Sequence, residues 1–205
     1  VVINSVTFQD DAFKEYVTQY IDTNNDGELF GDEIYAVQHL DLSGTSETDG
    51  GISSLAGIRW FTELVSLDCS YNRNLDILDL SWNTKITTLN ISGTGITSLE
   101  DFVGLGQTFE TLSLNDTAIT EIDLSNFPAL KTLNCRNTQI TSIDLSAASL
   151  ETIDISENTL LTEVGTMDAL ISNEYLVSVT ADDCPNLVSA CFENNTSLST
   201  ISFKN

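Results

Sequence analysis

A phrase of nine positions recurs along most of the chain and constrains its fold more than any other feature. Apolar residues occupy the first, fourth and sixth positions of the phrase, and Asn or Thr usually occupies the ninth. Clear copies begin at Leu64, Leu130 and Leu150. Self-similarity at intervals of about 20–29 residues indicates repeats that stack on one another, each burying its apolar face against its neighbours.

Each copy of the phrase is expected to open a short strand. Parallel strands from successive copies predict a curved sheet whose third and fifth positions lie on an open, concave face. A weaker copy follows in the second half of each repeat, as at 75–83, and predicts extended or loosely turned backbone on the convex side rather than an α-helix. The two longer repeats, 37–63 and 150–175, leave room for a short helical turn. The copies start at Val37, Leu64, Ile86, Phe109, Leu130, Leu150, Leu176 and Leu198.

These motifs resemble the leucine-rich-repeat family over residues 37–203, and the phrases at 67–70, 78–81 and 82–84 are similar to those of secreted or cell-surface repeat proteins of Bacteroides-type bacteria. The resemblance implies an α/β-type solenoid, mostly β, wound as a right-handed superhelix with a parallel sheet on its concave face. It also implies a secreted or cell-surface location. Because a solenoid needs capped ends, residues 1–36 are assigned to a small helical N-terminal cap and residues 37–205 to the solenoid.

Residues 22–33 form the sharpest chemical motif outside the repeat. Their spacing matches the twelve-residue calcium loop of the EF-hand family, with hard oxygen ligands and Gly27 at the sharp bend. Phe30 stands at the ninth place and supplies no ligand, and only one loop is present, so a structural calcium ion of modest affinity is expected. The alternative is an acidic turn that holds no metal. The expected ligands are Asp22, Asn24, Asp26, Glu28 and Glu33.

Residues 10–21 are expected to form an amphipathic helix before this loop. Asp10 or Asp11 is suited to cap its start, since a carboxylate there can accept hydrogen bonds from the first turn. A second short helix is expected to begin at 32–36. The apolar face of the first helix should consist of Phe13, Tyr16, Val17 and Tyr20.

The charge of the chain excludes several classes of partner. With 31 acidic and 7 basic residues, its formal net charge is -24. Such a charge repels nucleic acid and anionic membranes and attracts cations and basic partners, while also keeping an apolar solenoid soluble. No apolar stretch is long enough to span a membrane. The chain starts at Val1 without an initiator Met or a signal peptide, so it resembles a mature or trimmed product.

The cysteines do not indicate a redox compartment. Cys69 and Cys135 occupy the sixth position of the phrase, where a thiol acts as a small apolar side chain, and both are expected to be free. A bridge between Cys184 and Cys191 is disfavoured, since one side chain should point inward and the other outward.

No catalytic constellation stands out, so the chain is not expected to be an enzyme. The single histidine, His39, has no nucleophile or ligand companion in any motif. The concave columns are small, polar and mildly acidic, and the β-propensity of Thr explains them without a binding role. Trp60 is expected to pack on the convex side. The weak candidates for partner contacts are Asp41, Asp68, Tyr71 and Trp82.

The leading hypothesis is an extracellular or cell-surface module that recognises a protein partner, with calcium stiffening its cap. The alternative is a structural or spacer component of the cell envelope without a specific ligand. The last strand, at 198–203, is followed by no polar cap, so weak homodimerisation through this open C-terminal edge is also expected.

Overall fold

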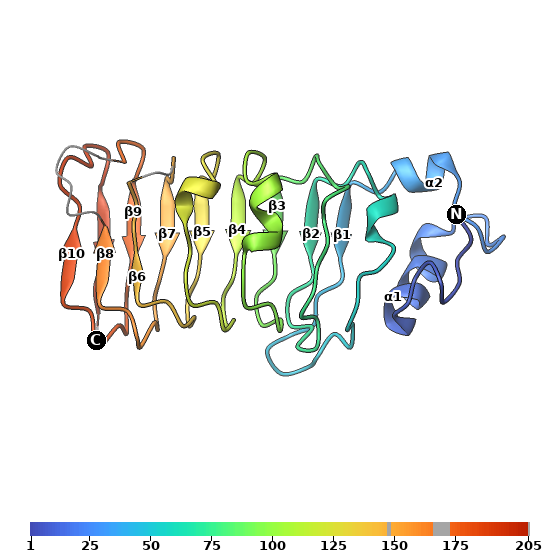
Figure 1. Cartoon of the computed structure of the whole chain (residues 1–205), viewed down its shortest axis with the longest axis horizontal. Coiled ribbons are helices and arrows are strands. Elements are labelled where there is room, and N and C mark those ends of the chain that lie inside the picture. The colour runs from blue at the N-terminus through green and yellow to red at the C-terminus, as the bar shows by residue number, and fades with distance from the viewer. Residues whose placement is uncertain (147–148, 166–172, 205) are drawn as a thin grey trace. The chain divides into compact units, whose positions relative to one another are not determined.

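The computed structural model describes residues 1–146, 149–165 and 173–204. It contains two compact units, Val1–Ile96 and Thr97–Asn205. The predicted boundary between the cap and the solenoid, at residues 36 and 37, lies inside the first unit. Each unit is built from parallel β-structure, and among the described residues α-helices occur only in the N-terminal region of the first unit (Figure 1). The predicted fold class, a mostly-β parallel solenoid with a small helical cap, is confirmed.

The first unit contains a parallel sheet whose strands fall at the third to fifth positions of the phrase, as predicted. Its strands are β1 (His39–Asp41), β2 (Ser66–Asp68) and β3 (Thr88–Asn90), and equivalent positions of the phrase pair in register. The central residue of each strand is buried and its neighbours are more exposed. Because side chains alternate across a strand, one face of the sheet covers the core and the other is open.

The second unit repeats this arrangement and adds a second sheet. The second sheet has the order β10-β8-β6 and comes from the second halves of successive repeats, where extended backbone was predicted. Its strands are β6 (Ser142–Ile143), β8 (Glu163–Gly165) and β10 (Ser189–Cys191). The strands at the third to fifth positions are β4 (Thr111–Ser113), β5 (Thr132–Asn134), β7 (Thr152–Asp154), β9 (Ser178–Thr180) and β11 (Thr200–Ser202).

Short 3₁₀ helices occupy other second halves of the repeats. They are η2 (Ile58–Trp60), η3 (Glu100–Leu105) and η4 (Leu124–Asn126). Within the described ranges the second halves contain no α-helix, which confirms the prediction for that part of the chain. The helical turn predicted in repeat 37–63 is η2, while most of the extra length of repeat 150–175 falls at 166–172, outside the described residues.

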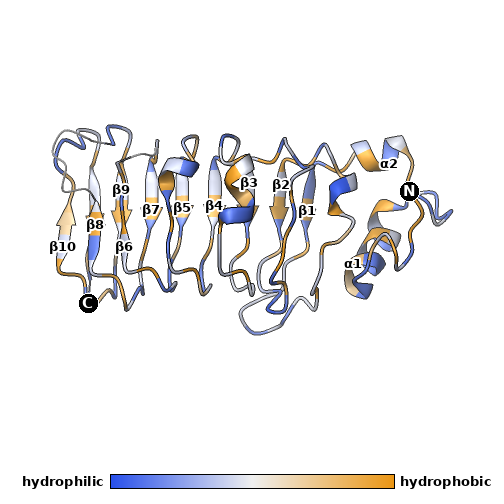
Figure 2. Cartoon of the chain, in the orientation of Figure 1, coloured by the Kyte–Doolittle hydropathy of each residue, from blue (hydrophilic) through white to orange (hydrophobic). Residues whose placement is uncertain are grey.

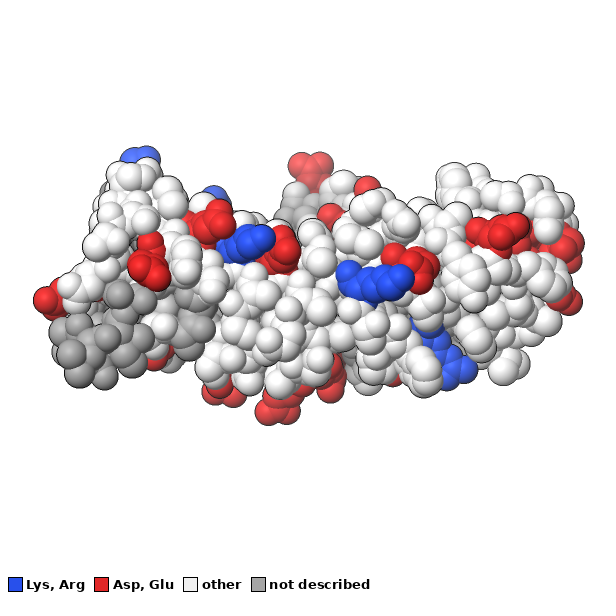
Figure 3. Space-filling model, turned by 90° about the horizontal axis from the view of Figure 1, so that it is seen from above, with Lys and Arg blue, Asp and Glu red and all other residues white. Residues whose placement is uncertain are grey.

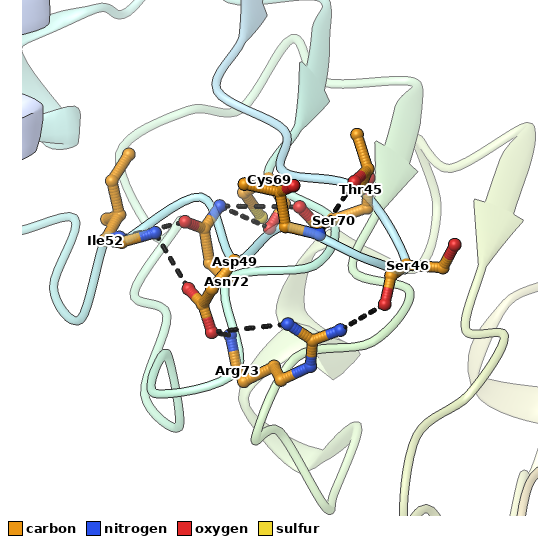
Figure 4. Close-up of polar contacts among 10 residues, drawn as sticks. Thr45, Ser46, Asp49, Ile52, Cys69, Ser70, Asn72 and Arg73 are labelled. Atoms are coloured by element: carbon orange, nitrogen blue, oxygen red, sulfur yellow. Dashed lines mark hydrogen bonds and ion pairs between the residues drawn. The ribbon is translucent and has the colours of Figure 1, made fainter.

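Buried Asn side chains at the ninth position bind neighbouring repeats together. Asn72 has no exposed surface. Its Oδ1 accepts from the main-chain N–H of Ile52 at 2.9 Å, and its Nδ2 donates to the carbonyls of Leu42 at 2.8 Å and Cys69 at 2.9 Å (Figure 4). One side chain therefore satisfies three main-chain groups from two repeats, as expected for the repeat asparagine.

Asn158 plays the same part in the second unit, and Thr at this position does less. Asn158 donates to the carbonyls of Cys135 and Ile155 at 2.8 and 2.7 Å and accepts from Thr138 N at 2.8 Å. Thr94 makes a single short bond, from its hydroxyl to the carbonyl of Ile91 at 2.7 Å. The predicted difference between Asn and Thr is confirmed.

The residue before the ninth position adopts a left-handed backbone conformation, which the sequence interpretation missed. Six repeats have a backbone φ between 51° and 64° there. This conformation is strained for residues other than Gly, Asn and Asp, so the frequency of those three types is the signal that was available. The six residues are Tyr71, Gly93, Asp116, Asn137, Glu157 and Asp183.

All four cysteines are free, as predicted. Cys69 and Cys135 are fully buried in the core, and this burial raises the pKa of both thiols far above its ordinary value. Cys184 is also buried, whereas Cys191 is partly exposed.

The cap contains α1 (Asp11–Tyr16), a π-helical turn η1 (Val17–Ile21) and α2 (Gly31–Tyr35). Asp10 caps α1, and its Oδ1 accepts from Phe13 N at 3.0 Å. The same carboxylate reaches the first repeat, because Oδ2 accepts from the main-chain N–H and the hydroxyl of Ser53, both at 2.8 Å.

The predicted apolar face of the first helix is wrong at its end. Phe13, Val17 and Ile21 are buried, but Tyr20 is 62% exposed and Tyr16 is only half-buried. The π turn changes the helical phase after Tyr16, so the buried stripe continues to Ile21.

Candidate functional site

The open face of the first-unit sheet brings together the two acidic candidates of the concave columns. Asp41 and Asp68 are register partners on β1 and β2. Asn90, the next residue in the row, donates from Nδ2 to Asp68 Oδ2 at 2.8 Å. In the neighbouring row, His39 Nδ1 lies 3.1 Å from Ser66 Oγ. The predicted columns are therefore present, and this part of the face is acidic.

A second function of these aspartates is to end the strands. Asp41 Oδ1 accepts from the main-chain N–H and the hydroxyl of Ser43 at 3.1 and 2.7 Å. Asp68 Oδ1 does the same with Ser70 at 2.9 and 2.6 Å. Asp commonly forms this local turn with a Ser two residues later, which explains the recurring Leu-Asp-x-Ser phrase. One oxygen of each carboxylate is thus structural.

Tyr71 follows β2 and is fixed by its surroundings. Its ring packs so close to Gly93 that a Cβ on that glycine would lie 2.5 Å from the ring. Its main-chain N–H donates to Ser92 O at 2.6 Å, and its carbonyl accepts from Gly50 N at 3.0 Å. Asp41, Asp68 and Tyr71 therefore belong to one ordered edge of the first unit.

The loop that borders this edge is fastened by Arg73. Its guanidinium donates to the carbonyl of Ser46 at 2.6 Å and lies 3.7 Å from a carboxylate oxygen of Asp49 (Figure 4). This long loop is therefore tied to the repeat that follows it.

Trp82 does not lie with the other three candidates. It belongs to the outward side of segment 75–83, is 62% exposed, and lines a hollow with Tyr35 and Trp60. The predicted packing of Trp60 on the convex side is incomplete, since 36% of Trp60 is exposed. In the 3₁₀ turn η2, Ile58 and Phe61 are three residues apart and both point inward, which leaves Trp60 outside.

A separate hollow of about 350 Å³ lies beside the N-terminal end of the open face. Tyr16, Tyr20 and His39 contribute to its lining. Burial, followed by the charge of Asp41 and the neighbouring Tyr20, raises the pKa of the Tyr16 hydroxyl. The sequence placed Tyr16 and Tyr20 in the core of the cap and so gave no sign of this hollow.

The predicted calcium loop is closed by its own side chains. Asp22 is buried, and its two carboxylate oxygens accept from Asp26 N at 3.3 Å and Gly27 N at 3.0 Å. Asn24 Oδ1 accepts from Asp26 N at 2.9 Å, and Asp26 Oδ1 accepts from Glu28 N at 2.9 Å. Gly27 has a φ of 78°, which the sharp bend requires.

Two further sets of hydrogen bonds complete the loop. Glu33 accepts hydrogen bonds from Thr23 N at 2.9 Å and from Phe30 N at 3.1 Å. Both bonds lower the pKa of its carboxyl, and the bond from Phe30 has the larger effect. Leu29 exchanges hydrogen bonds with Val1 at 2.6 and 2.7 Å, so residues 1–3 run antiparallel to 27–29. The loop is thus supported by an extended segment.

The donor chemistry of the loop suits a calcium ion, but its carboxylates are not gathered in this structure. Carboxylate, amide and carbonyl oxygens are the ligands that calcium prefers. In the part of the chain that the structure describes, no group of three or more His, Cys, Asp and Glu side chains is arranged to hold a metal ion, and Glu33 faces the main chain. Among the described residues there is accordingly no preformed metal centre of that kind.

The basic residues are largely neutralised by ion pairs. Six of the seven Lys and Arg side chains lie within 4.0 Å of a carboxylate; the pairs are Lys14–Asp11, Arg73–Asp49, Lys85–Glu63, Lys131–Glu110, Arg136–Glu157 and Lys204–Asp182. On the face shown in Figure 3, several blue side chains lie directly against red ones. Arg59 is the exception among the described residues, and it lies 5.0 Å from the centre of the Trp60 ring instead.

Comparison with known proteins identifies the repeat. The family model of Leucine Rich repeats (2 copies) matches residues 110–147. No curated protein matches the chain. Residues 110–147 are therefore similar to leucine-rich repeats, and proteins of that class generally serve as protein-binding scaffolds and are typically not enzymes.

Solved structures show the same fold. Internalin C2 of Listeria monocytogenes is 22% identical, with a TM-score of 0.69 and a match over 97% of this chain and 95% of that one. The internalin inlF of the same organism is 14% identical, with a TM-score of 0.53 over 98% and 97%. The leucine-rich repeat domain of APL1B is 18% identical, with a TM-score of 0.53 over 72% of this chain and 45% of that one. These likenesses establish the fold alone.

Hydrophobic and hydrophilic residues are mixed along each repeat (Figure 2). Among the described residues, no helix is long and apolar enough to cross a membrane.

Proposed function

We propose that this protein is an extracellular or cell-surface recognition module that binds a protein partner through the open sheet face of its first unit. The observation that carries the proposal is the pairing of Asp41 with Asp68 across β1 and β2, next to the ordered Tyr71. A tyrosine held in one conformation loses little entropy on binding, and paired carboxylates attract a basic partner. The extracellular location rests on the resemblance of the repeat phrases to secreted bacterial proteins.

A capture experiment tests this proposal. The variant Asp41→Asn/Asp68→Asn/Tyr71→Ala removes the charge and the ring but keeps the strand-ending turn, since Asn90 makes the same turn with Ser92 N at 3.1 Å. We expect the wild-type protein to retain a partner from host or envelope extract and the variant to lose it. Asp154→Asn in β7 is the matched control, because Asp154 makes the equivalent turn with Ser156 N at 3.0 Å.

Two results would contradict this proposal. Equal capture by the wild type and the variant would move recognition away from this surface. No capture by either protein would favour a structural or spacer role in the envelope. Protease treatment of intact cells tests the location, since a surface protein is degraded and an internal one is protected.

We further propose that the 22–33 loop binds a structural calcium ion through Asp22, Asn24, Asp26, the carbonyl of Glu28, and Glu33. The spacing of these donors, the left-handed Gly27 and the support from residues 1–3 favour this assignment. When bound, the ion would supply positive charge to a cap region rich in carboxylates. Glu33 already accepts from Thr23 and Phe30, so the ion has to compete with these bonds, and modest affinity is expected.

Calcium should therefore raise the melting temperature of the protein. At a free concentration of about 100 times Kd, linkage predicts a stabilisation of about 2.7 kcal/mol, and Asp26→Ala should abolish it. Calorimetry and thermal unfolding, in calcium and in chelator, measure the effect; magnesium is the control ion. An unchanged melting temperature together with no heat of binding would contradict the calcium assignment and show that the loop is an acidic turn without a metal ion.

The C-terminal edge supports a third proposal, weak self-association of the chain. Ile201, Phe203 and Val188 are exposed there, and β11 lies at the end of its sheet among the described residues. Exposed strand edges with apolar side chains favour pairing with a second copy. Light scattering at rising concentration should show a rising mean mass, and Ile201→Lys should suppress it; a constant monomeric mass would contradict the proposal.

A further inference from the structure

We propose that a groove between Tyr35, Trp60 and Trp82 in the first unit binds a basic, proline-rich peptide in an extended conformation. We call it the aromatic groove. This inference rests on the proposed role in protein recognition and names the class of partner at a second surface. It concerns the convex side of the repeats and does not depend on the calcium loop.

The aromatic groove is an open, largely apolar hollow of about 590 Å³. Tyr35 is 61% exposed and Trp82 62%, and Trp60 is also partly exposed. Together they place three large aromatic side chains, the types most enriched at binding hot spots, around one hollow. The volume lies within the usual range for ligand sites, about 300–1,000 Å³.

A second, more acidic hollow of about 640 Å³ adjoins the groove. The two hollows share Arg59 and Trp60, and the second is also lined by Asp76 and Asp79. Its lining thus contains two carboxylates and one guanidinium, so its local charge is negative, in a chain whose net charge is -24. The surface therefore offers an aromatic part and an acidic part in succession.

The repeat does not require these side chains. In segment 75–83, the inward residues continue the repeat and the outward ones include Ile77 and Trp82. At the position of Ile77, the next two clear copies of this half-phrase have Glu121 and Ser142, and at the position of Trp82 the first of them has Asn126. The apolar outward residues are thus a local departure from a polar pattern.

An extended, proline-rich peptide suits this succession of surfaces. Such peptides adopt a polyproline helix without internal hydrogen bonds, so they lose little entropy when they dock in aromatic-lined grooves. A basic residue following the prolines would reach the hollow that contains Asp76 and Asp79. Because nucleic acid and acidic peptides are repelled by the overall charge, the partner should be cationic.

Intrinsic fluorescence provides a direct test, because both tryptophans of the chain, Trp60 and Trp82, line the groove. The probe is a short synthetic proline-rich peptide with one arginine, compared with the same peptide carrying glutamine in its place. We expect a saturable change in fluorescence and a heat of binding by calorimetry. Trp82→Ala should weaken binding at least about tenfold, the effect of losing a hot-spot side chain.

Charge recognition is tested separately with Asp76→Asn. This variant should lower the affinity for the arginine peptide about threefold and leave the affinity for the glutamine peptide unchanged, as expected for a solvent-exposed ion pair. Tyr175→Ala, an exposed aromatic side chain of the second unit, is the matched control and should bind like the wild type. Circular dichroism of each variant verifies that it is folded.

Several outcomes would overturn the inference. Among them are unchanged binding by Trp82→Ala, equal affinity for the two peptides, and binding of an amphipathic helical peptide or an oligosaccharide but not of the proline-rich peptide. The capture experiment with the Asp41, Asp68 and Tyr71 variant reports on another surface. Loss of capture there, combined with no peptide binding here, would retain the recognition function and reject only the aromatic groove.

Discussion

Replacing Asn72 with Ala is expected to lower the free energy of unfolding by about 3–5 kcal/mol. The substitution leaves the N–H of Ile52 and the carbonyls of Leu42 and Cys69 buried without this partner. Each buried polar group that loses its partner costs about 1–3 kcal/mol, and water has no access to a side chain with no exposed surface. The measurement is urea unfolding followed by circular dichroism.

A threonine at the same position of the next repeat provides the matched control for this prediction. Thr94→Val removes one hydroxyl bond, to the carbonyl of Ile91, and keeps the volume of the side chain. We expect a loss of about 1 kcal/mol. If Asn72→Ala and Thr94→Val destabilised the protein equally, the bridging role of the asparagine would be refuted.

Replacing Asp10 should have the second-largest effect, and the effect should depend on pH. Its carboxylate caps α1 through Phe13 N and holds the cap to the first repeat through Ser53. Loss of a helix cap costs about 1 kcal/mol, and each hydrogen bond to a charged group contributes about 1.5–3 kcal/mol. We expect Asp10→Ala to lower the free energy of unfolding by about 3 kcal/mol at neutral pH.

The sign of the pH dependence follows from the pKa of Asp10. Burial alone would raise it, but the hydrogen bonds from Phe13 and Ser53 outweigh burial and place it below its ordinary value of 3.8. A carboxyl with a depressed pKa in the folded state stabilises the protein above its unfolded pKa, and that stability is lost as the pH falls through the folded value. The difference between the wild type and Asp10→Asn should therefore shrink below about pH 4.

Unfolding in urea at a series of pH values measures this difference. Asp11→Asn is the control, because Asp11 is exposed and its pair with Lys14 should contribute little. A difference between wild type and Asp10→Asn that stayed constant on acidification would show that the charge of Asp10 does not stabilise the cap.

The sequence predicted the strands of the repeat well because one physical rule governs them. A side chain at the fourth position has to be buried, and those at the third and fifth then face solvent. The same rule predicted the acidic pair Asp41 and Asp68 on the open face. It also placed Asn72 in the core, since an amide there can satisfy main-chain groups that a solenoid would otherwise bury unpaired.

Features outside this rule were not predictable from the phrase. Trp60 is exposed because η2 has three residues per turn. Phe61, which follows this turn, stacks on Phe8 of the cap, and the repeat phrase does not encode that contact between distant segments. Tyr20 is exposed because a π turn changes the phase of the cap helix. The groove around Trp82 unites residues 35, 60 and 82 from three separate segments, and no local pattern relates them.

The placement of the thiols gives each unit its own reporter of opening. Cys69 belongs to the first unit, whereas Cys135 and Cys184 belong to the second, and all three are buried. A sealed thiol with a raised pKa reacts with alkylating reagents only after the surrounding chain opens. Mass spectrometry of timed alkylation would therefore give opening rates residue by residue, and would distinguish units that open independently from units that open together.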